Sequence, residues 1–187
     1  LIKWGVMGLV GLFFVAVVVG VLMFVISAWL GQPLSVFGFD EGPDQPIAFP
    51  HTRHVQDLGL DCTFCHRNVE KGAAATVPPV ALCMTCHSVV GDNLEEVEKL
   101  REIAASGEAI DWVRVHRLPD HVHFNHSAHV LFFSQRDGTQ SSEVCVVCHG
   151  DVGSMVKVKQ ARYLQMSDCV NCHRDNDAPT DCVTCHY

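Results

Sequence analysis

The chain has 187 residues, of which 48% are hydrophobic, and a formal net charge of −8 at pH 7 with histidine neutral. This acidic balance excludes a nucleic-acid-binding role and favours partners with basic faces. Ten cysteines and 12 histidines are many for this length, so cofactor or metal chemistry is the first question that the sequence raises.

The amino-terminal part of the chain is strongly apolar. Lys3 is the only charged residue before Asp40, and residues 6–30 are apolar except for three glycines and one serine. This run exceeds the ~20 residues that a helix needs to cross a bilayer, and it is longer than the apolar region of about 7–15 residues in a cleaved signal peptide. We therefore predict a retained transmembrane anchor over residues 1–32, with the end that carries Lys3 in the cytoplasm.

A short linker is expected between this anchor and the rest of the chain. Residues 33–48 contain three prolines and two glycines, a composition that keeps a connecting segment extended and free of regular structure.

One pentapeptide pattern, Cys-x-x-Cys-His, uses every cysteine of the chain and predicts c-type haem attachment. It occurs at residues 62–66, 83–87, 145–149, 169–173 and 182–186. Two thiols of each motif would form thioethers with one porphyrin, and the adjacent histidine would bind its iron. The predicted thioether residues are Cys62, Cys65, Cys83, Cys86, Cys145, Cys148, Cys169, Cys172, Cys182 and Cys185, and the proximal ligands are His66, His87, His149, His173 and His186.

Three other uses of paired cysteines compete with this interpretation. A structural zinc site needs four ligands and no histidine at a set position after the second cysteine. A thioredoxin-like motif is usually single, and a disulfide framework places no constraint on the next residue. Five repeats with the same trailing histidine favour five covalently bound haem c groups.

The number of haems predicts the fold. Only about thirty residues per motif remain outside the anchor, too few to build a large side-chain core. We expect a mainly α-helical and irregular multihaem cytochrome c, with short helices at the motifs, little sheet and polypeptide wrapped around clustered haems. Since haem is attached outside the bacterial cytoplasmic membrane, this domain is expected on the periplasmic side.

An internal repeat divides the remaining chain. The pattern F-x-H-x-x-H begins at Phe49 and again at Phe124, and two haem motifs follow each copy. Such a repeat marks a structural unit used twice. The predicted organisation is a di-haem unit over residues 49–91, a connecting helix and segment over 92–123, and a second di-haem unit with the fifth haem over 124–187. The connecting helix is expected to begin at Asp92 or Asn93 and to end at Gly107.

Seven histidines outside the motifs are candidates for the second axial ligand of each iron. They gather ahead of the haem motifs, and two histidines three residues apart on a helix cannot bind one iron from opposite sides. Each is therefore expected to serve a different haem. The predicted distal ligands are His51, His54, His116, His126 and His129, with His121 and His123 as spares and with Met155 and Met166 as alternative thioether ligands.

These features resemble the cytochrome c7/c3-like multihaem proteins. More narrowly, the chain resembles the pentahaem, membrane-anchored cytochrome c (ActA) of bacterial alternative complex III, through its single helix, its five motifs and residues 112–120 leading into the second F-x-H-x-x-H. The resemblance implies a quinol-oxidising complex. Its expected partners are integral quinone-binding subunits, an iron–sulfur subunit, and a monohaem cytochrome c or blue-copper acceptor.

The leading functional hypothesis is an electron relay within a membrane quinol:electron-acceptor oxidoreductase. If histidines close both sides of every iron, none is open to substrate, which favours electron transfer over catalysis. One alternative is a stand-alone quinol dehydrogenase of the NapC/NrfH type. Another is a catalytic multihaem reductase or a haem-based sensor, which needs an open iron.

Overall fold

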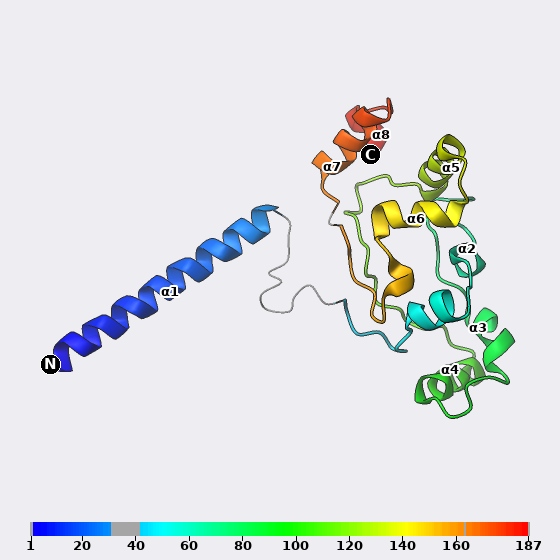
Figure 1. Cartoon of the computed structure of the whole chain (residues 1–187), viewed down its shortest axis with the longest axis horizontal. Helices are drawn as coiled ribbons and strands as arrows, with labels where there is room; N and C mark the ends of the chain where they lie inside the picture. The colour runs from blue at the N-terminus through cyan, green and yellow to red at the C-terminus, as the bar shows by residue number, and fades with distance from the viewer. Residues whose placement is uncertain (1, 31–41, 163, 187) are drawn as a thin grey trace. The chain divides into compact units, whose positions relative to one another are not determined.

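The structure of the chain is a computed structural model, and it describes residues 2–30, 42–162 and 164–186 (Figure 1). The chain divides into two units, Leu1–Glu41 and Gly42–Tyr187. Residues 31–41, which include most of the predicted linker, lie outside the described residues.

The first unit is one helix, α1, which spans Ile2–Leu30. At 1.5 Å per residue its 29 residues extend about 43 Å, enough to cross a hydrocarbon layer of about 30 Å. Its segment Met7–Trp29 has a mean hydropathy of 3.1, and none of its most apolar stretch is buried against other parts of the described chain. The predicted apolar amino-terminal helix is confirmed, and it is the one helix in the described part of the chain that is long and apolar enough to span a membrane.

The second unit consists of short helices joined by irregular segments, as the sequence predicts. No β-strand occurs among the described residues, and one isolated antiparallel bridge joins Val122 to His186. The elements after α1 are η2 (Arg53–Asp57), α2 (Cys62–Cys65), α3 (Val80–His87), α4 (Glu95–Ser106), α5 (His126–Asp137), α6 (Ser141–His149), η3 (Val152–Ser154), α7 (Met166–Asp175) and α8 (Cys182–Cys185).

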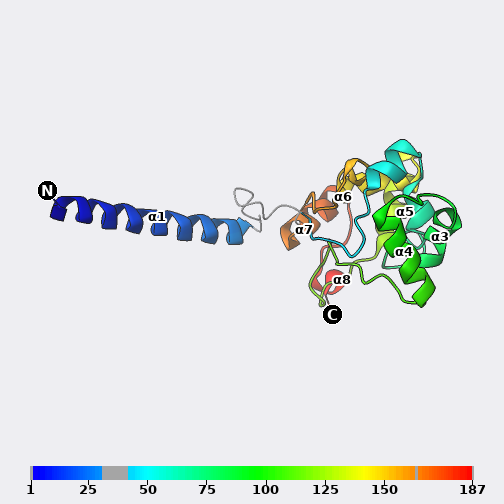
Figure 2. The ribbon, with the colours of Figure 1, turned by 90° about the horizontal axis from the view of Figure 1, so that it is seen from below.

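Packing between these helices brings the haem motifs together. Helix α6 contacts both α5 and α2, α3 contacts α4, and η2 contacts η3. In both views α3 and α4 lie side by side (Figure 2). Helix α6, which carries the third motif, is therefore central, because it touches the first motif on α2 and the second pair of histidines on α5.

The second unit has almost no side-chain core. Among the described residues, six hydrophobic side chains are buried, and none of them is fully enclosed: Ile47, Val69, Val97, Leu100, Val130 and Val144. Ordering a chain of this size requires far more buried apolar surface. The described polypeptide therefore buries too few side chains to form a core by itself, as expected of a chain that wraps around haems.

Helix α4 ends as predicted but begins differently. Gly107 terminates it in the left-handed conformation, at a φ of 75°. The expected cap by Asp92 or Asn93 is wrong, because the helix starts at Glu95 with Leu94 in the cap position. The Asp92 carboxylate instead accepts a hydrogen bond from Arg101 Nη2 at 2.7 Å. The Nε atom of the same arginine donates to the carbonyl oxygen of His87, also at 2.7 Å. This link ties α4 to the second haem motif.

Substituting Gly91 with alanine is expected to lower the stability of the holoprotein by about 1–3 kcal/mol. Gly91 has a φ of 90°, and a Cβ there would meet Val97 Cγ2 at 2.9 Å, so the turn between α3 and α4 would have to shift. Thermal unfolding of the purified protein measures the effect. Gly72→Ala is the control, because a Cβ at Gly72 meets nothing within 4 Å; equal melting temperatures for the two variants would contradict the prediction.

Candidate haem-binding sites

Each Cys-x-x-Cys-His motif lies on a helical turn. Residues three apart on a helix share a face, so the two thiols of a motif point the same way. Helices α2 and α8 consist of the four residues from one cysteine to the next, and the histidine follows directly at the end. Helices α3 and α6 end at the motif histidine, and α7 continues two residues beyond it.

The cysteine geometry disfavours the competing uses of these motifs. All ten thiols are free, so no disulfide framework exists. Within the described residues no three His, Cys, Asp or Glu side chains gather as a metal-binding group, whereas a structural zinc site requires four convergent ligands.

Hydrogen bonds to backbone carbonyls orient the motif histidines. His66 Nδ1 lies 2.5 Å from the Thr76 carbonyl oxygen, and His173 Nδ1 lies 2.6 Å from that of Pro179. The same contact joins His87 to Val90 and His186 to His121, both at 3.2 Å. Because a carbonyl only accepts, Nδ1 carries the hydrogen, and a neutral ring then has its free electron pair on Nε2. This is the arrangement in which histidine binds a metal through Nε2.

The two F-x-H-x-x-H segments share one local geometry. Phe49 stacks on His54 at a centroid distance of 4.3 Å, and Phe124 stacks on His129 at 4.5 Å. Each phenylalanine also meets the first histidine of its segment edge-on, at 5.0 and 4.9 Å. The aromatic rings therefore hold both imidazoles of each turn, and the predicted repeat is visible in three dimensions.

Hydrogen bonds orient histidines of these segments in the same way as those of the motifs. Nδ1 of His126 lies 2.7 Å from the Ala73 carbonyl, and Nδ1 of His129 lies 2.8 Å from the Asn125 carbonyl. His54 makes the same contact with Pro50 at 3.4 Å. Their Nε2 atoms are thus also left with a free electron pair.

Three pairs of imidazoles have the separation that one iron between them requires. A metal-bound imidazole nitrogen lies about 2 Å from the metal, so rings on opposite faces of one iron have centroids about 6 Å apart. The observed centroid distances are 6.0 Å for His54–His87, 6.2 Å for His126–His149 and 6.0 Å for His129–His173. Each pair joins one histidine of an F-x-H-x-x-H segment to one motif histidine, so these residues fit haem ligation.

His51 lies close enough to His66 of the first motif to interact with it electrostatically. Burial, with smaller contributions from the nearby His66 and His54, lowers the pKa of His51 to about 4 and keeps its ring neutral at pH 7. Its Nδ1 atom is buried and has no hydrogen-bond partner. His51 thus differs from His54, His126 and His129, whose Nδ1 atoms each lie against a carbonyl oxygen.

The structure places His116 differently from the other predicted distal ligands. Its ring centroid is 4.3 Å from that of His149, with the planes at 85°, too close for an iron between the two rings. Burial, followed by the neighbouring His116, His126 and His66, lowers the pKa of His149 to about 4. His116 thus lies beside the third motif, and the ring that stands 6.2 Å from His149 belongs to His126.

His121, which the sequence leaves as a spare, is the ring neighbour of the fifth motif. Its centroid is 5.5 Å from that of His186, and the His123 amide donates to the Cys185 carbonyl at 2.7 Å. Nothing in the local pattern separates His121 from His116, because the contact depends on a bridge between segments 64 residues apart in the chain, Val122 with His186.

The two candidate methionines have different surroundings. The Met155 carbonyl accepts a hydrogen bond from the His51 amide at 3.1 Å, so this residue adjoins the first ligand turn through its backbone. Met166 begins α7 with 70% of the residue exposed. Their role as alternative ligands stays a prediction.

Asp61→Ala is expected to destabilise the holoprotein by about 1 kcal/mol at pH 7. The Asp61 carboxylate caps α2 by accepting from the Thr63 amide at 2.8 Å, and hydrogen bonds from Ser142 and Thr63 lower its pKa. A lowered folded-state pKa adds stability above the unfolded value, and this stability is lost as pH falls through the folded value. Melting temperatures at pH 7 and pH 3 test this; the difference should shrink at pH 3.

The control for this substitution is Asp57→Ala. Asp57 makes an exposed pair with Arg53 on η2, and such a pair contributes only a few tenths of a kcal/mol. The assigned role of the Asp61 carboxylate would be contradicted if the melting temperatures of Asp61→Ala and the parent differed by the same amount at pH 7 and at pH 3.

Comparison with known proteins places this chain among multihaem cytochromes. No family model matches it. The "Menaquinone reductase, multiheme cytochrome c subunit" of Nitratidesulfovibrio vulgaris (strain Hildenborough) is 32% identical over 186 residues, which cover 90% of this chain and 87% of that protein. Because this identity extends over nearly the whole length, the chain belongs to the family of the multihaem cytochrome c subunit of menaquinone reductase.

Proposed function

We propose that this chain carries five haem c groups and relays single electrons between a periplasmic redox protein and the membrane subunits of a menaquinone-reducing complex. The pairing of imidazoles at about 6 Å beside the motifs carries the proposal. The relative's role in menaquinone reductase supports menaquinone as the quinone.

The protein residues in this proposal hold and insulate the redox groups. A bound haem supplies one-electron chemistry at its iron. The cysteines of the motifs would fix each porphyrin, and His51, His54, His126 and His129 would close the irons of motifs one to four opposite their proximal histidines. The ring beside His186 of the fifth motif is His121, so His121 would be the fifth distal ligand in place of His116. Saturated irons exchange electrons but do not bind substrate, which favours a relay.

Partner subunits are part of this proposal. Reduction of one menaquinone to menaquinol consumes two electrons and two protons, and in the proposed complex another subunit holds the quinone and supplies the protons. The expected partners are integral membrane quinone-binding subunits and an iron–sulfur subunit, with a monohaem cytochrome c or blue-copper protein on the periplasmic side. Helix α1 would hold the chain in the bacterial cytoplasmic membrane.

A second candidate function runs the same relay in the opposite direction. The resemblance of residues 112–120 and the following F-x-H-x-x-H to the pentahaem cytochrome of alternative complex III favours oxidation of quinol and delivery of electrons to a periplasmic acceptor. The stand-alone quinol dehydrogenase of the NapC/NrfH type is the third possibility, and it differs because it needs no further subunit.

Purification of the full chain from its native membrane in mild detergent tests these proposals. The mass of the chain is expected to show five covalent haems, and the assembly is expected to contain integral and iron–sulfur subunits. Electrons supplied by a reduced periplasmic cytochrome should then reduce a menaquinone analogue. The double variant Cys145→Ala/Cys148→Ala, assembled with the same subunits, should do so at least tenfold more slowly.

Each alternative gives a different result in this experiment. Electron flow that occurs only from a menaquinol analogue to the cytochrome would support the complex III-like direction. Quinol oxidation by the isolated chain would support the stand-alone dehydrogenase. Fewer than five covalent haems would contradict the proposed cofactor content.

A further inference from the structure

The haem motifs are not arranged in space as they follow one another in the sequence. We infer that the five attachment sites form one unbranched line in the order two, one, three, four, five, numbered by their motifs along the chain. This order rests on the proposed haem content and extends it, because it specifies which sites are the two ends of the relay.

Sites one and two adjoin each other through a shared ligand turn. His51 pairs with the first motif and His54 with the second, and the two are three residues apart on the same turn. Burial and the nearby Cys83 thiol raise the pKa of Cys65, so Cys65 of the first motif lies near Cys83 of the second.

Sites one and three adjoin each other through α2 and α6, which pack together. The cap residue of α2, Asp61, bonds to Ser142 of α6. Burial and the adjacent Cys62 thiol raise the pKa of Cys145 to about 11, which places the first cysteine of one motif against the first cysteine of the other.

One loop also orients a ligand of each of these two sites. The Thr76 carbonyl accepts from His66 of the first motif at 2.5 Å, and the Ala73 carbonyl accepts from His126, the ring opposite the third motif, at 2.7 Å. The Ser127 amide adds a bond to the Gly72 carbonyl at 3.1 Å. The junction between sites one and three is thus built from backbone as well as side chains.

Sites three and four repeat the arrangement of sites one and two. His126 and His129 lie three residues apart on α5 and pair with His149 and His173. Burial and the nearby Cys172 thiol, opposed by Arg162, raise the pKa of Cys148. In addition, Arg136 of α5 donates to Asn176, at the end of α7, at 2.5 Å.

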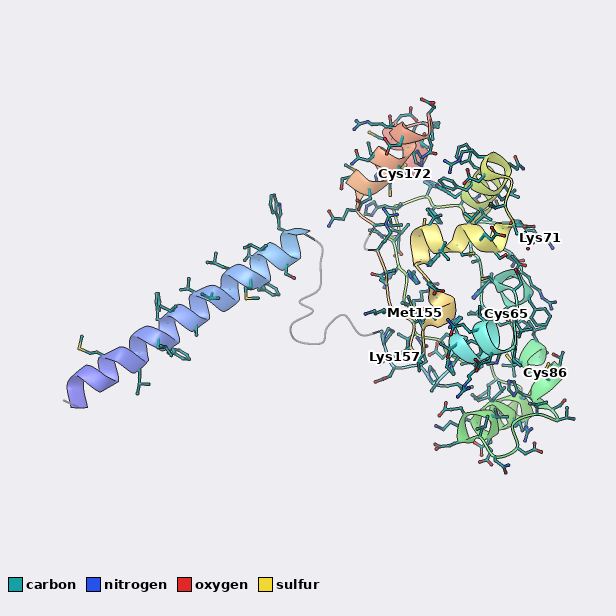
Figure 3. The ribbon with its side chains drawn as sticks, in the orientation of Figure 1. Cys65, Lys71, Cys86, Met155, Lys157 and Cys172 are labelled. Atoms are coloured by element: carbon teal, nitrogen blue, oxygen red, sulfur yellow. The ribbon has the colours of Figure 1, made fainter. Side chains whose placement is uncertain are left out.

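Site five adjoins site four. His173 Nδ1 of the fourth motif lies 2.6 Å from the carbonyl oxygen of Pro179, three residues before the first cysteine of the fifth motif. The nearby Cys185 thiol, after burial, also raises the pKa of Cys169. The first and third motifs use one cysteine for each neighbour. Among the cysteines labelled in Figure 3, Cys65 of site one lies between Cys86 of site two and Cys172 of site four.

Two haem-removal variants of the full chain distinguish this order from the sequence order. Cys62→Ala/Cys65→Ala removes site one, and Cys83→Ala/Cys86→Ala removes site two. Neighbouring haems shift each other's midpoint potentials by Coulomb interaction. Removing an interior site should therefore change the potentials of two of the four remaining haems, and removing an end site should change the potential of one. Potentials are read by spectroelectrochemical titration and by low-temperature electron paramagnetic resonance of the purified protein.

The inferred line predicts two shifted haems after loss of site one and one after loss of site two. One shifted haem after loss of site one, together with two shifted haems after loss of site two, would establish the sequence order and overturn the inference. Should either variant fail to fold, iron positions in an experimental structure of the holoprotein decide: site one has to neighbour both two and three, and site two must not neighbour three. Failure of this order would leave five covalent haems in place, whereas failure of the proposed function would show as missing haem mass.

Discussion

Produced without covalent haem attachment, the full chain is expected to lose cooperative folding in residues 42–187 while α1 stays helical in detergent. Only six buried hydrophobic side chains are found in the described part of this unit, and none is fully enclosed. Ordering the backbone costs about 1–2 kcal/mol per residue, which so small a core cannot offset. Attached porphyrins would supply the missing apolar surface.

Thermal melting and amide hydrogen exchange measure this loss. The holoprotein should show one cooperative transition and protected amides in α5 and α6, and the haem-free chain should show neither. A variant with all ten cysteines replaced by alanine, expressed beside the haem-attachment machinery, is the matched control and should behave like the haem-free chain. A cooperative transition in the haem-free chain would show that the polypeptide has a core of its own.

His54→Ala is expected to open one iron and to convert about one fifth of the haem from low-spin to high-spin. His54 stacks on Phe49 and stands 6.0 Å from His87, the separation expected for two ligands of one iron. The opened iron should bind one carbon monoxide per protein after reduction. Electron paramagnetic resonance and carbon monoxide difference spectra measure both changes.

His116→Ala serves as the matched comparison. Since the His116 ring lies 4.3 Å from His149, its removal is expected to leave every iron low-spin. If His116→Ala produced the high-spin signal, His116 would be the fifth distal ligand, as the sequence predicts, and His121 would not be. If His54→Ala left the spin state unchanged, the assignment of His54 to the second motif would be wrong.

Local patterns were sufficient to predict a multihaem cytochrome c with a mostly helical fold and one apolar amino-terminal helix. A thioether site needs only two cysteines on one helical turn and an adjacent histidine, so each motif is complete within five residues. The apolar run from which α1 forms is equally local, since length and hydropathy alone decide whether a helix can cross a bilayer. The doubled F-x-H-x-x-H also indicates the shared ligand turns, because residues three apart on a helix cannot bind opposite faces of one iron.

Pairing of ligands and the order of sites depend on contacts that no local pattern records. His116 and His121 are equally plausible by position, and the contact with His186 that separates them requires Val122 to reach the end of the chain. Likewise, the first and third motifs adjoin only because α2 packs on α6. An attachment motif is a short-range property of the chain, whereas the neighbours of each iron are set by helix packing between distant segments, and so they emerged only from the folded molecule.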